Sequence, residues 1–129
     1  MSIINFIIAL ALFLVLDFLW LGLIASKIYK KELKEISKKR FNLIPGAIVY
    51  LLLSLGVVLF VFNNTLANSL LSVFLIGALL GFIFYGIYDF TNLSTLKKWS
   101  LKLTIIDVLW GTFLVGIVSV LTKYLGGLW

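Results

Sequence analysis

Four long apolar runs strongly constrain the fold of this chain. They cover roughly residues 3–26, 44–62, 70–90 and 103–122. Each approaches or exceeds the ~20 residues that a helix needs to cross ~30 Å of hydrocarbon. Because 63% of the 129 residues are hydrophobic and 12% are charged, little remains for a soluble domain. The sequence predicts an all-α, polytopic membrane protein: a four-transmembrane-helix bundle forming a single membrane domain, residues 1–129.

Lysine and arginine predict the orientation of these helices. The basic residues between the first two runs are Lys27, Lys30, Lys31, Lys34, Lys38, Lys39 and Arg40, and those between the last two runs are Lys97, Lys98 and Lys102. Cytoplasmic loops of membrane proteins carry such an excess. We therefore expect both connections in the cytoplasm and both termini outside. The net charge of +6 follows the membrane, so no nucleic acid partner is expected.

Residues 27–41 have the pattern of an amphipathic extension of the first helix into the cytoplasm. Tyr29, Leu33 and Ile36 recur at helical spacing, and the lysines occupy the other faces. We expect this segment to lie along the inner leaflet, with the basic residues of Lys27–Arg40 at anionic lipid head groups. Glu35 and Lys39 are spaced to form an ion pair on the helix.

The residue types that are missing exclude several kinds of chemistry. The chain has no cysteine and no histidine, which excludes thiolate and imidazole metal sites, Ser-His-Asp and Cys-His nucleophiles, and disulfides. Acid–base chemistry must use Asp, Glu, Tyr or Lys. No metal site and no cofactor are predicted. The first run has no charge over residues 2–16 and is expected to remain as a helix rather than a cleaved signal peptide.

Three aspartates lie within or at the edge of the apolar runs: Asp17, Asp89 and Asp107. A charged side chain at membrane depth costs about 2.5–3.5 kcal/mol on insertion scales, so these residues indicate function. Asp17 and Asp107 each begin an Asp-x-Leu-Trp phrase that ends at Trp20 or Trp110. At 1.5 Å per residue from the nearest lysine, Asp17 lies ~15 Å and Asp107 ~8 Å from the inner surface. We expect all three carboxyl groups to converge in one pocket open to the cytoplasm.

Tyrosines and small residues mark the helix faces around that pocket. Tyr50, Tyr85 and Tyr88 fall in the same inner half of the membrane, and Gly46, Tyr50 and Ser54 form a stripe that is expected to face other helices. The spacing of Gly77 and Gly81 predicts close helix approach in the outer half. Asn42 followed by Pro45 predicts the start of the second helix.

Residues 85–99 are the densest polar segment of the chain. Asp, Thr, Asn and Ser compete with helical structure by bonding to the local backbone. We therefore expect the third helix to end between Asp89 and Asn92, with Thr91 or Asn92 capping the next helical turn. A broken helix end beside a cavity is typical of binding sites in membranes, which makes Asp89 the strongest single candidate.

Longer motifs support a family resemblance. They are Tyr88-Asp89-Phe90-Thr91-Asn92-Leu93-Ser94-Thr95-Leu96, Trp99-Ser100-Leu101-Lys102-Leu103-Thr104, Asp107-Val108-Leu109-Trp110-Gly111-Thr112 and Leu16-Asp17-Phe18-Leu19-Trp20-Leu21-Gly22. Over essentially its whole length the chain resembles a widespread bacterial family of small four-helix inner-membrane proteins, known only as a domain of unknown function. Ser100 stands where that family has proline. The resemblance implies a bacterial inner-membrane protein and no particular activity.

Three functions are compatible with these residues. The first is a transporter or channel for a proton, a cation or a small amine, acting as a homodimer, since four helices make a thin bundle. Its candidate binding residues are Asp17, Trp20, Tyr50, Tyr85, Tyr88, Asp89, Thr91, Asn92, Asp107 and Trp110. The second is a membrane-embedded enzyme acting on a lipid or isoprenoid.

The third is a structural or accessory subunit in which the aspartates hold the helices in register. Asp89 then caps a helix, and Asp107 pairs with Lys97, Lys98 or Lys102. Asp17 accepts hydrogen bonds from Tyr50, Tyr88 or Trp110.

Overall fold

The computed structural model describes residues 3–37 and 42–127, which form helices joined by short turns. The elements are α1 (Ile3–Leu19), the π-helical turn η1 (Trp20–Ile24), α2 (Ser26–Leu33), α3 (Leu43–Gly56), the π-helical turn η2 (Val57–Val61), α4 (Leu70–Thr95) and α5 (Leu101–Leu125). Four stretches are long and apolar enough to cross a membrane: Ile3–Ile24, Leu43–Val61, Leu70–Thr95 and Leu101–Leu125. The predicted all-α protein with four spanning helices is confirmed.

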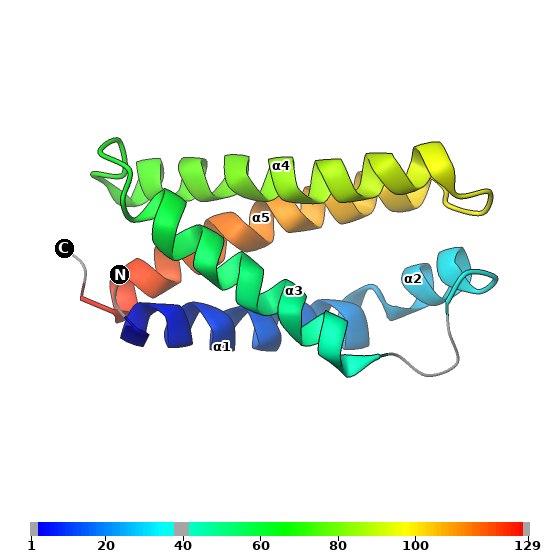
Figure 1. The fold of residues 1–129 in the computed structure, drawn as a ribbon, viewed down its shortest axis with the longest axis horizontal. Coiled ribbons are helices and arrows are strands. Elements are labelled where there is room, and N and C mark those ends of the chain that lie inside the picture. Colours follow the sequence, from blue (N-terminus) through cyan, green and yellow to red (C-terminus); the bar gives the residue numbers. More distant parts are fainter. Residues whose placement is uncertain (1–2, 38–41, 128–129) are drawn as a thin grey trace.

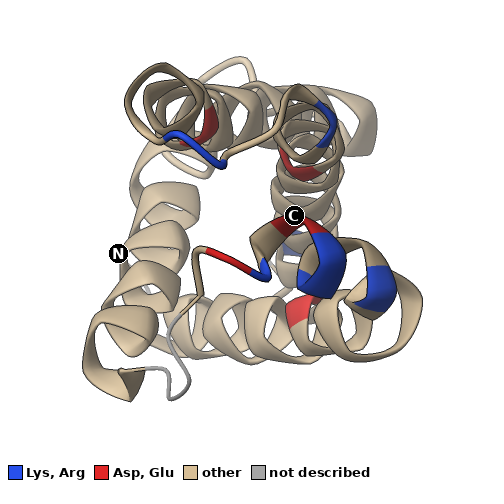
Figure 2. Cartoon of the chain, turned by 90° about the vertical axis from the view of Figure 1, so that its right-hand side faces the viewer, with Lys and Arg blue, Asp and Glu red and all other residues tan. Residues whose placement is uncertain are grey.

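The helices form a bundle with chemically different ends (Figure 1). α4 packs along α5, and α1 packs on α5 and α3. The start of α1 and the end of α5 lie at one end, which we call the terminal end; α2 and the α4–α5 connection lie at the other, which we call the lysine-rich end. Figure 2, viewed onto the lysine-rich end, shows basic residues on α2 and on that connection. The predicted head-group residues Lys38, Lys39 and Arg40 lie outside the described part of the chain.

Glycines bring α4 and α5 into close contact. A Cβ atom at Gly77 would lie 2.4 Å from Ser119 Oγ, and one at Gly81 would lie 2.3 Å from the backbone oxygen of Gly111. Only glycine permits such backbone approach, so the predicted role of this pair is confirmed. Gly46 is different: it is exposed, and nothing lies within 4 Å of a Cβ placed there. The predicted helix-facing stripe is therefore wrong at Gly46, although it holds further along α3, where Tyr50 donates to Asp17 and Ser54 is fully buried.

The terminal half of the bundle is tightly filled. Its core contains fully buried side chains from every spanning segment: Ala9, Phe13, Val57, Val61, Val73, Leu114, Val115 and Val118. The hydroxyl group of buried Ser119 donates to the backbone oxygen of Val115 at 2.7 Å, so it adds no unsatisfied donor to this core. The polar candidates lie in the opposite half, where the packing is looser.

Polar side chains begin three of the helices. Asn42 Oδ1 accepts from Ile44 N at 3.1 Å, as the sequence predicts for the start of α3. Ser69 and Ser72 form a reciprocal capping box at the start of α4. Ser100, where the resembled family has proline, accepts from Leu103 N at 3.0 Å and so caps α5. The Ser100 hydroxyl group thus satisfies one of the backbone donors that are free at the start of a helix.

α4 continues beyond the point where the sequence predicts its end. It runs without interruption to Thr95, so Asp89 lies within a helix and the expected break between Asp89 and Asn92 is wrong. The Thr95 hydroxyl group donates to Thr91 O at 2.8 Å, and Leu96 N donates to Asn92 O at 2.8 Å. These bonds add to the helix instead of competing with it. Thr91 and Asn92 therefore do not cap a following turn.

The basic extension is shorter than predicted and faces a different way. α2 ends at Leu33, and turns follow over residues 34–37. Ala25 separates it from η1 with φ −109° and ψ 9°, which changes the direction of the chain. Tyr29 and Leu33 line a cavity in the protein. The prediction that these two residues face the leaflet is wrong, because their side of α2 packs toward the bundle.

Lys123 holds the terminal end together. Its side chain is buried, and Nζ donates to the backbone oxygen of Ala67 in the α3–α4 connection at 2.8 Å. Lys123→Met leaves that carbonyl group without this donor, and we expect a loss of about 1 kcal/mol in the free energy of unfolding. Unfolding by dodecyl sulfate in micelles, followed by circular dichroism, measures it. Tyr124→Phe, at an exposed neighbour, is the control; equal midpoints for both variants contradict this role.

Candidate functional site

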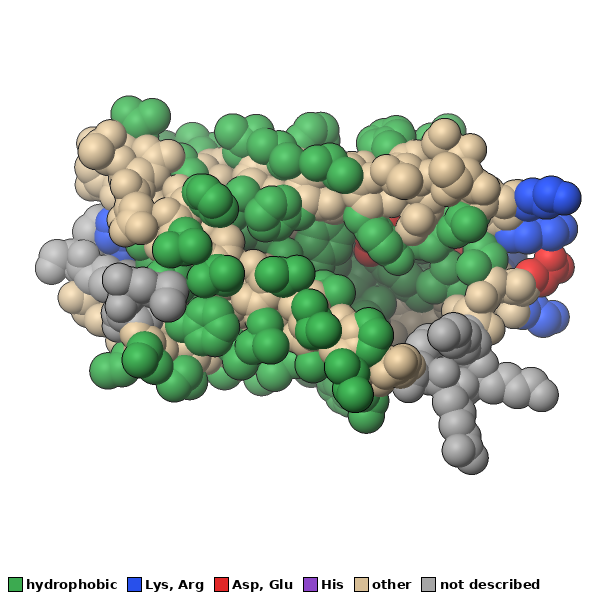
Figure 3. All heavy atoms as spheres, in the orientation of Figure 1, with side chains coloured by type: hydrophobic (Ala, Val, Ile, Leu, Met, Phe, Trp, Pro, Cys, Tyr) green, Lys and Arg blue, Asp and Glu red, His purple; other side chains and the backbone are tan. Residues whose placement is uncertain are grey.

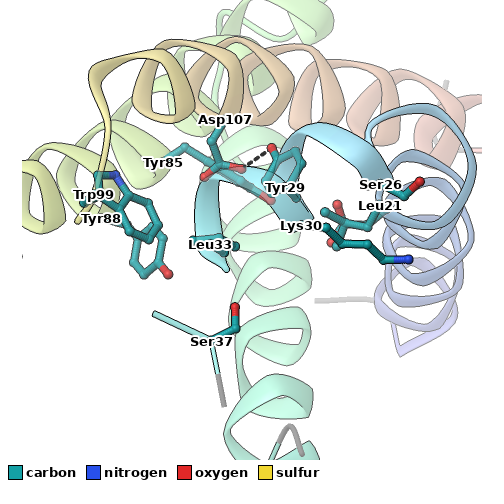
Figure 4. Close-up of a pocket in the computed structure, with 11 residues that line it drawn as sticks. Leu21, Ser26, Tyr29, Lys30, Leu33, Ser37, Tyr85, Tyr88, Trp99 and Asp107 are labelled. Atoms are coloured by element: carbon teal, nitrogen blue, oxygen red, sulfur yellow. Dashed lines mark hydrogen bonds between the residues drawn. The ribbon is translucent and has the colours of Figure 1, made fainter. Parts of the chain in front are cut away.

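A cavity of about 410 Å³ lies at the lysine-rich end (Figure 4). Its walls come from α1, η1, α2, the turns after α2, α4, the α4–α5 connection and α5. The residues that line it are Asp17, Leu21, Ser26, Tyr29, Lys30, Leu33, Ser37, Tyr85, Tyr88, Trp99 and Asp107. Two of the three predicted aspartates and two of the predicted tyrosines therefore share one cavity.

Asp17 is held by two donors from other helices. Trp110 Nε1 of α5 donates to Asp17 Oδ1 at 2.9 Å, and the Tyr50 hydroxyl group of α3 donates to Oδ2. Both carboxyl oxygens thus have a partner, and only 7% of the residue is exposed. These bonds confirm two of the donors that the sequence suggested. They connect α1 to α3 and α5, which is the arrangement of a residue that orients helices.

The two Asp-x-Leu-Trp phrases contact each other through their tryptophan side chains. Trp110 of the second phrase donates to Asp17 of the first. Trp20 of the first stacks on Trp110, with ring centroids 4.4 Å apart and ring planes at 5°. Trp20 Nε1 also donates to the Tyr29 hydroxyl group at 3.2 Å, and that hydroxyl group donates to Asp107 at 2.7 Å. Each tryptophan therefore supports the aspartate of the other phrase, one directly and one through Tyr29.

Tyr29 belongs to the site, although the sequence predicts it on the lipid-facing side of the amphipathic extension. Figure 4 shows its hydroxyl group joined to Asp107. Burial, and then the nearby negative charge of Asp107, raise the pKa of Tyr29 well above its usual value. The hydroxyl group consequently stays a proton donor at physiological pH. Its only signal in the sequence was a hydroxyl group on an otherwise apolar helix face, which also fits an ordinary interfacial tyrosine.

Asp89 and Asp107 form a pair of carboxyl groups across the α4–α5 interface. Asp89 has no exposed surface, and within the described chain no side-chain or backbone donor reaches either of its oxygens. Its carboxyl group interacts with that of Asp107 on α5. Two adjacent carboxylates of like charge repel strongly when both are ionised. The pair therefore requires a proton or a cation between or beside its members.

Lysines do not neutralise this pair. In the described part of the chain, the ion pair that forms is Lys98 with Glu35, at 3.2 Å on the surface. The predicted alternative, Asp107 paired with Lys97, Lys98 or Lys102, is wrong, because the chain folds Asp107 toward Tyr29 and Asp89. Lys30 lines the cavity, and its side chain points away from Asp107 in Figure 4. Among the described residues, no group of three or more acidic side chains is arranged to hold a metal ion.

Aromatic rings form the rest of the wall near Asp107. The Tyr85 ring occupies the space above Gly111, where a Cβ atom would lie 2.1 Å from Tyr85 Cγ. Tyr88 packs edge-on against Trp99, with ring centroids 5.9 Å apart. Trp99 Nε1 donates to Thr104 Oγ1 at 3.0 Å, which fixes the indole ring. Ring faces beside carboxylates are the common chemistry of sites for organic cations.

The predicted site residues thus divide into three groups. Asp17, Tyr85, Tyr88 and Asp107 line the cavity. Behind its wall lie Asp89, Trp20, Tyr50 and Trp110, which hydrogen-bond or pack with the lining residues. Thr91 and Asn92 do not line it; Thr91 is exposed, and Asn92 bonds to the neighbouring Tyr88. The helical path of α4 puts these two residues one turn beyond the site.

Comparison with known proteins identifies the family of this chain. No curated protein and no solved structure matches the chain. A family model described as a predicted membrane protein, DUF2177, matches residues 2–124. That match contains every site residue described above and all four spanning segments, apart from Leu125 at the end of α5. The chain belongs to the DUF2177 family of predicted membrane proteins.

Proposed function

We propose that the protein is a small carrier that exchanges protons for an organic cation at Asp107. The observation that carries this proposal is the pairing of Asp89, which is fully buried, with Asp107, which lines the cavity, without a lysine partner for either in the described chain. One shared proton satisfies the pair when the cavity is empty. A cation that contacts Asp107 removes the need for that proton, which leaves through the cavity. Binding and proton release are then coupled by charge alone.

The lining of the cavity supports an ammonium group as the cation. Asp107 supplies the negative charge, and Tyr85, Tyr88 and Trp99 supply ring faces on one side of it. Each such cation–π contact contributes about 0.5–2 kcal/mol. Asp17 is less suited to binding, because both of its oxygens already accept hydrogen bonds.

The direction of the cavity follows from the lysines. The positive-inside rule places the lysine-rich end in the cytoplasm, so the cavity opens to that side, and the packed terminal half closes the other. The basic side chains of α2 then lie near anionic head groups. In a bacterium this membrane is the inner membrane. Movement across the terminal half requires a rearrangement of the helices, and we propose that a second copy of the chain takes part in it.

Proton flux in proteoliposomes tests this function. Vesicles containing a pH-sensitive dye receive an imposed gradient of tetramethylammonium or of methylammonium. We expect a change of internal pH with native protein and at least a tenfold lower rate with Asp107→Asn, because a neutral amide in the cavity wall cannot attract the cation by charge. Asp89→Asn is expected to bind the cation and to lose most of the coupled proton movement.

Glu35→Gln is the matched control, because Glu35 is an exposed carboxylate at the same end that pairs with Lys98. Its flux should stay within twofold of the native rate. Equal flux in Asp107→Asn and native protein overturns the proposal, as does the lack of any flux from a folded protein with both cations. If Asp89→Asn and Asp107→Asn lower only the thermal stability, the aspartates have a structural role instead.

A further inference from the structure

An apolar groove reaches the same aspartate from the side of the bundle. Two hollows, of about 310 and 480 Å³, lie between α3 and α4 and share Val49, Leu53 and Phe84 in their walls. Figure 3 shows this hollow among hydrophobic side chains, with acidic atoms visible at its floor. Leu52, Phe60 and Ile87 lie along it and are more than half exposed. In a membrane this flank faces lipid.

The groove exists because α3 diverges from α4 toward the lysine-rich end (Figure 1). At its other end α3 meets α4: a Cβ atom at Gly56 would lie 3.0 Å from Phe84 Cε2. From there α3 leans onto α1, where the Tyr50 hydroxyl group donates to Asp17. The hydrogen bond to Asp17 therefore helps to hold the groove open.

The inner end of the groove is polar. The smaller hollow is lined by Tyr85, Tyr88 and Asp107, which also line the cavity at the lysine-rich end. The two openings thus meet at Asp107. The walls of both hollows contain no lysine or arginine among the described residues. A negatively charged phosphate or sulfate group in the groove would face Asp107 without a cation in the groove walls, and Lys30 in the adjoining cavity points away from Asp107.

We infer that the site takes a cationic amphiphile with a single alkyl chain, whose ammonium group binds at Asp107 and whose chain lies in the groove between α3 and α4. This inference rests on the proposed function and names its substrate class. The charge of Asp107 selects the head, and the apolar walls around Val49 and Leu53 accommodate the tail. Such a molecule enters from the lipid, so its tail need not cross water on the way to the site.

Binding of labelled octyltrimethylammonium to protein in phosphatidylcholine nanodiscs tests this inference, with empty nanodiscs as the blank. Tetramethylammonium has the head alone, and octyl sulfate has the tail with the opposite charge. We expect tetramethylammonium to displace the probe only at concentrations at least tenfold higher than unlabelled octyltrimethylammonium, since two buried methylene groups suffice for about that factor. Octyl sulfate should not displace it.

Variants distinguish the head site from the tail site. Val49→Trp fills the groove and is expected to weaken probe binding about tenfold, whereas Ile48→Trp, on the neighbouring exposed position, should stay within twofold of native. Asp107→Asn is expected to weaken it at least tenfold. Displacement by tetramethylammonium at the same concentration as the octyl compound overturns the tail site and leaves the carrier proposal intact.

Further results of the same experiment test other possible occupants of the groove and the proposed function itself. Displacement by octyl sulfate as efficient as by the ammonium compound shows that the groove holds any alkyl chain, as of a bilayer lipid, and overturns the inference. If native protein and Asp107→Asn bind the probe equally well, that result overturns the proposed function itself. Lack of saturable binding above empty nanodiscs overturns both.

Discussion

Gly81→Ala will destabilise the protein by about 3 kcal/mol, although alanine is the better helix former. A Cβ atom at this position lies 2.3 Å from the backbone oxygen of Gly111 and 2.9 Å from Val115 Cβ. A backbone atom cannot turn away as a flexible side chain can, so α4 and α5 must separate. The midpoint of unfolding by dodecyl sulfate, followed by circular dichroism in micelles, measures the loss.

Gly86→Ala is the matched control on the same helix. Nothing lies within 4 Å of a Cβ atom at Gly86, so alanine there is expected to leave stability unchanged or to raise it by up to about 1 kcal/mol. The two substitutions are chemically identical, so a difference in sign isolates the contact between α4 and α5. Equal effects of Gly81→Ala and Gly86→Ala contradict the close approach of the two helices.

The second large effect is expected at Asp17. Asp17→Ala removes the acceptor of both Trp110 Nε1 and the Tyr50 hydroxyl group. Interhelical hydrogen bonds in membranes contribute at most about 1.7 kcal/mol each, so the loss of both is expected to cost about 2 kcal/mol. Asp17→Asn keeps one acceptor oxygen and should lose about half as much. The same unfolding experiment measures both variants.

Transport by the Asp17 variants separates positioning from binding. Asp17→Asn is expected to keep at least half of the native cation-driven proton flux, because its neighbours stay in place, whereas Asp107→Asn loses it. A loss of flux in Asp17→Asn as complete as that in Asp107→Asn, in a protein of near-native stability, contradicts the positioning role. The residue then belongs to the binding site.

The aspartates therefore have different environments although the sequence presents them alike. Asp17 has two donors and connects three helices, Asp107 has one donor and faces the cavity, and Asp89 has only the neighbouring carboxyl group of Asp107. In the sequence all three are acidic residues in apolar surroundings. Hydrogen-bond partners depend on which helices pack together, and a single chain without its fold does not contain that information.

The sequence by itself determined the helices and the end of the bundle at which the site lies. Apolar length decides a spanning helix because an unpaired backbone group in hydrocarbon is too costly, and all four spans follow from it. The close approach of helices at Gly77 and Gly81 could also be predicted, because it requires the absence of a side chain. Asn42 also predicted the start of α3 through a local capping bond.

The position at which α4 ends could not be predicted from local residue preferences. Asp, Thr and Asn favour turns only when their side chains compete with the helical backbone. In α4 the Thr95 hydroxyl group adds a bond to Thr91 O, and Asp89 is directed against α5. Tertiary packing therefore outweighed local preference, as it often does.

Only the tertiary structure decided how the site is assembled. The close packing of α4 on α5 sets the register that puts Asp89 beside Asp107, and the turn at Ala25 brings Tyr29 to the same aspartate. The divergence of α3 from α4 opens the apolar groove. Helix formation depends on neighbours along the chain and on the membrane, which sequence encodes directly. The site depends on contacts between residues as far apart as Asp17 and Trp110, which only the packing of whole helices can fix.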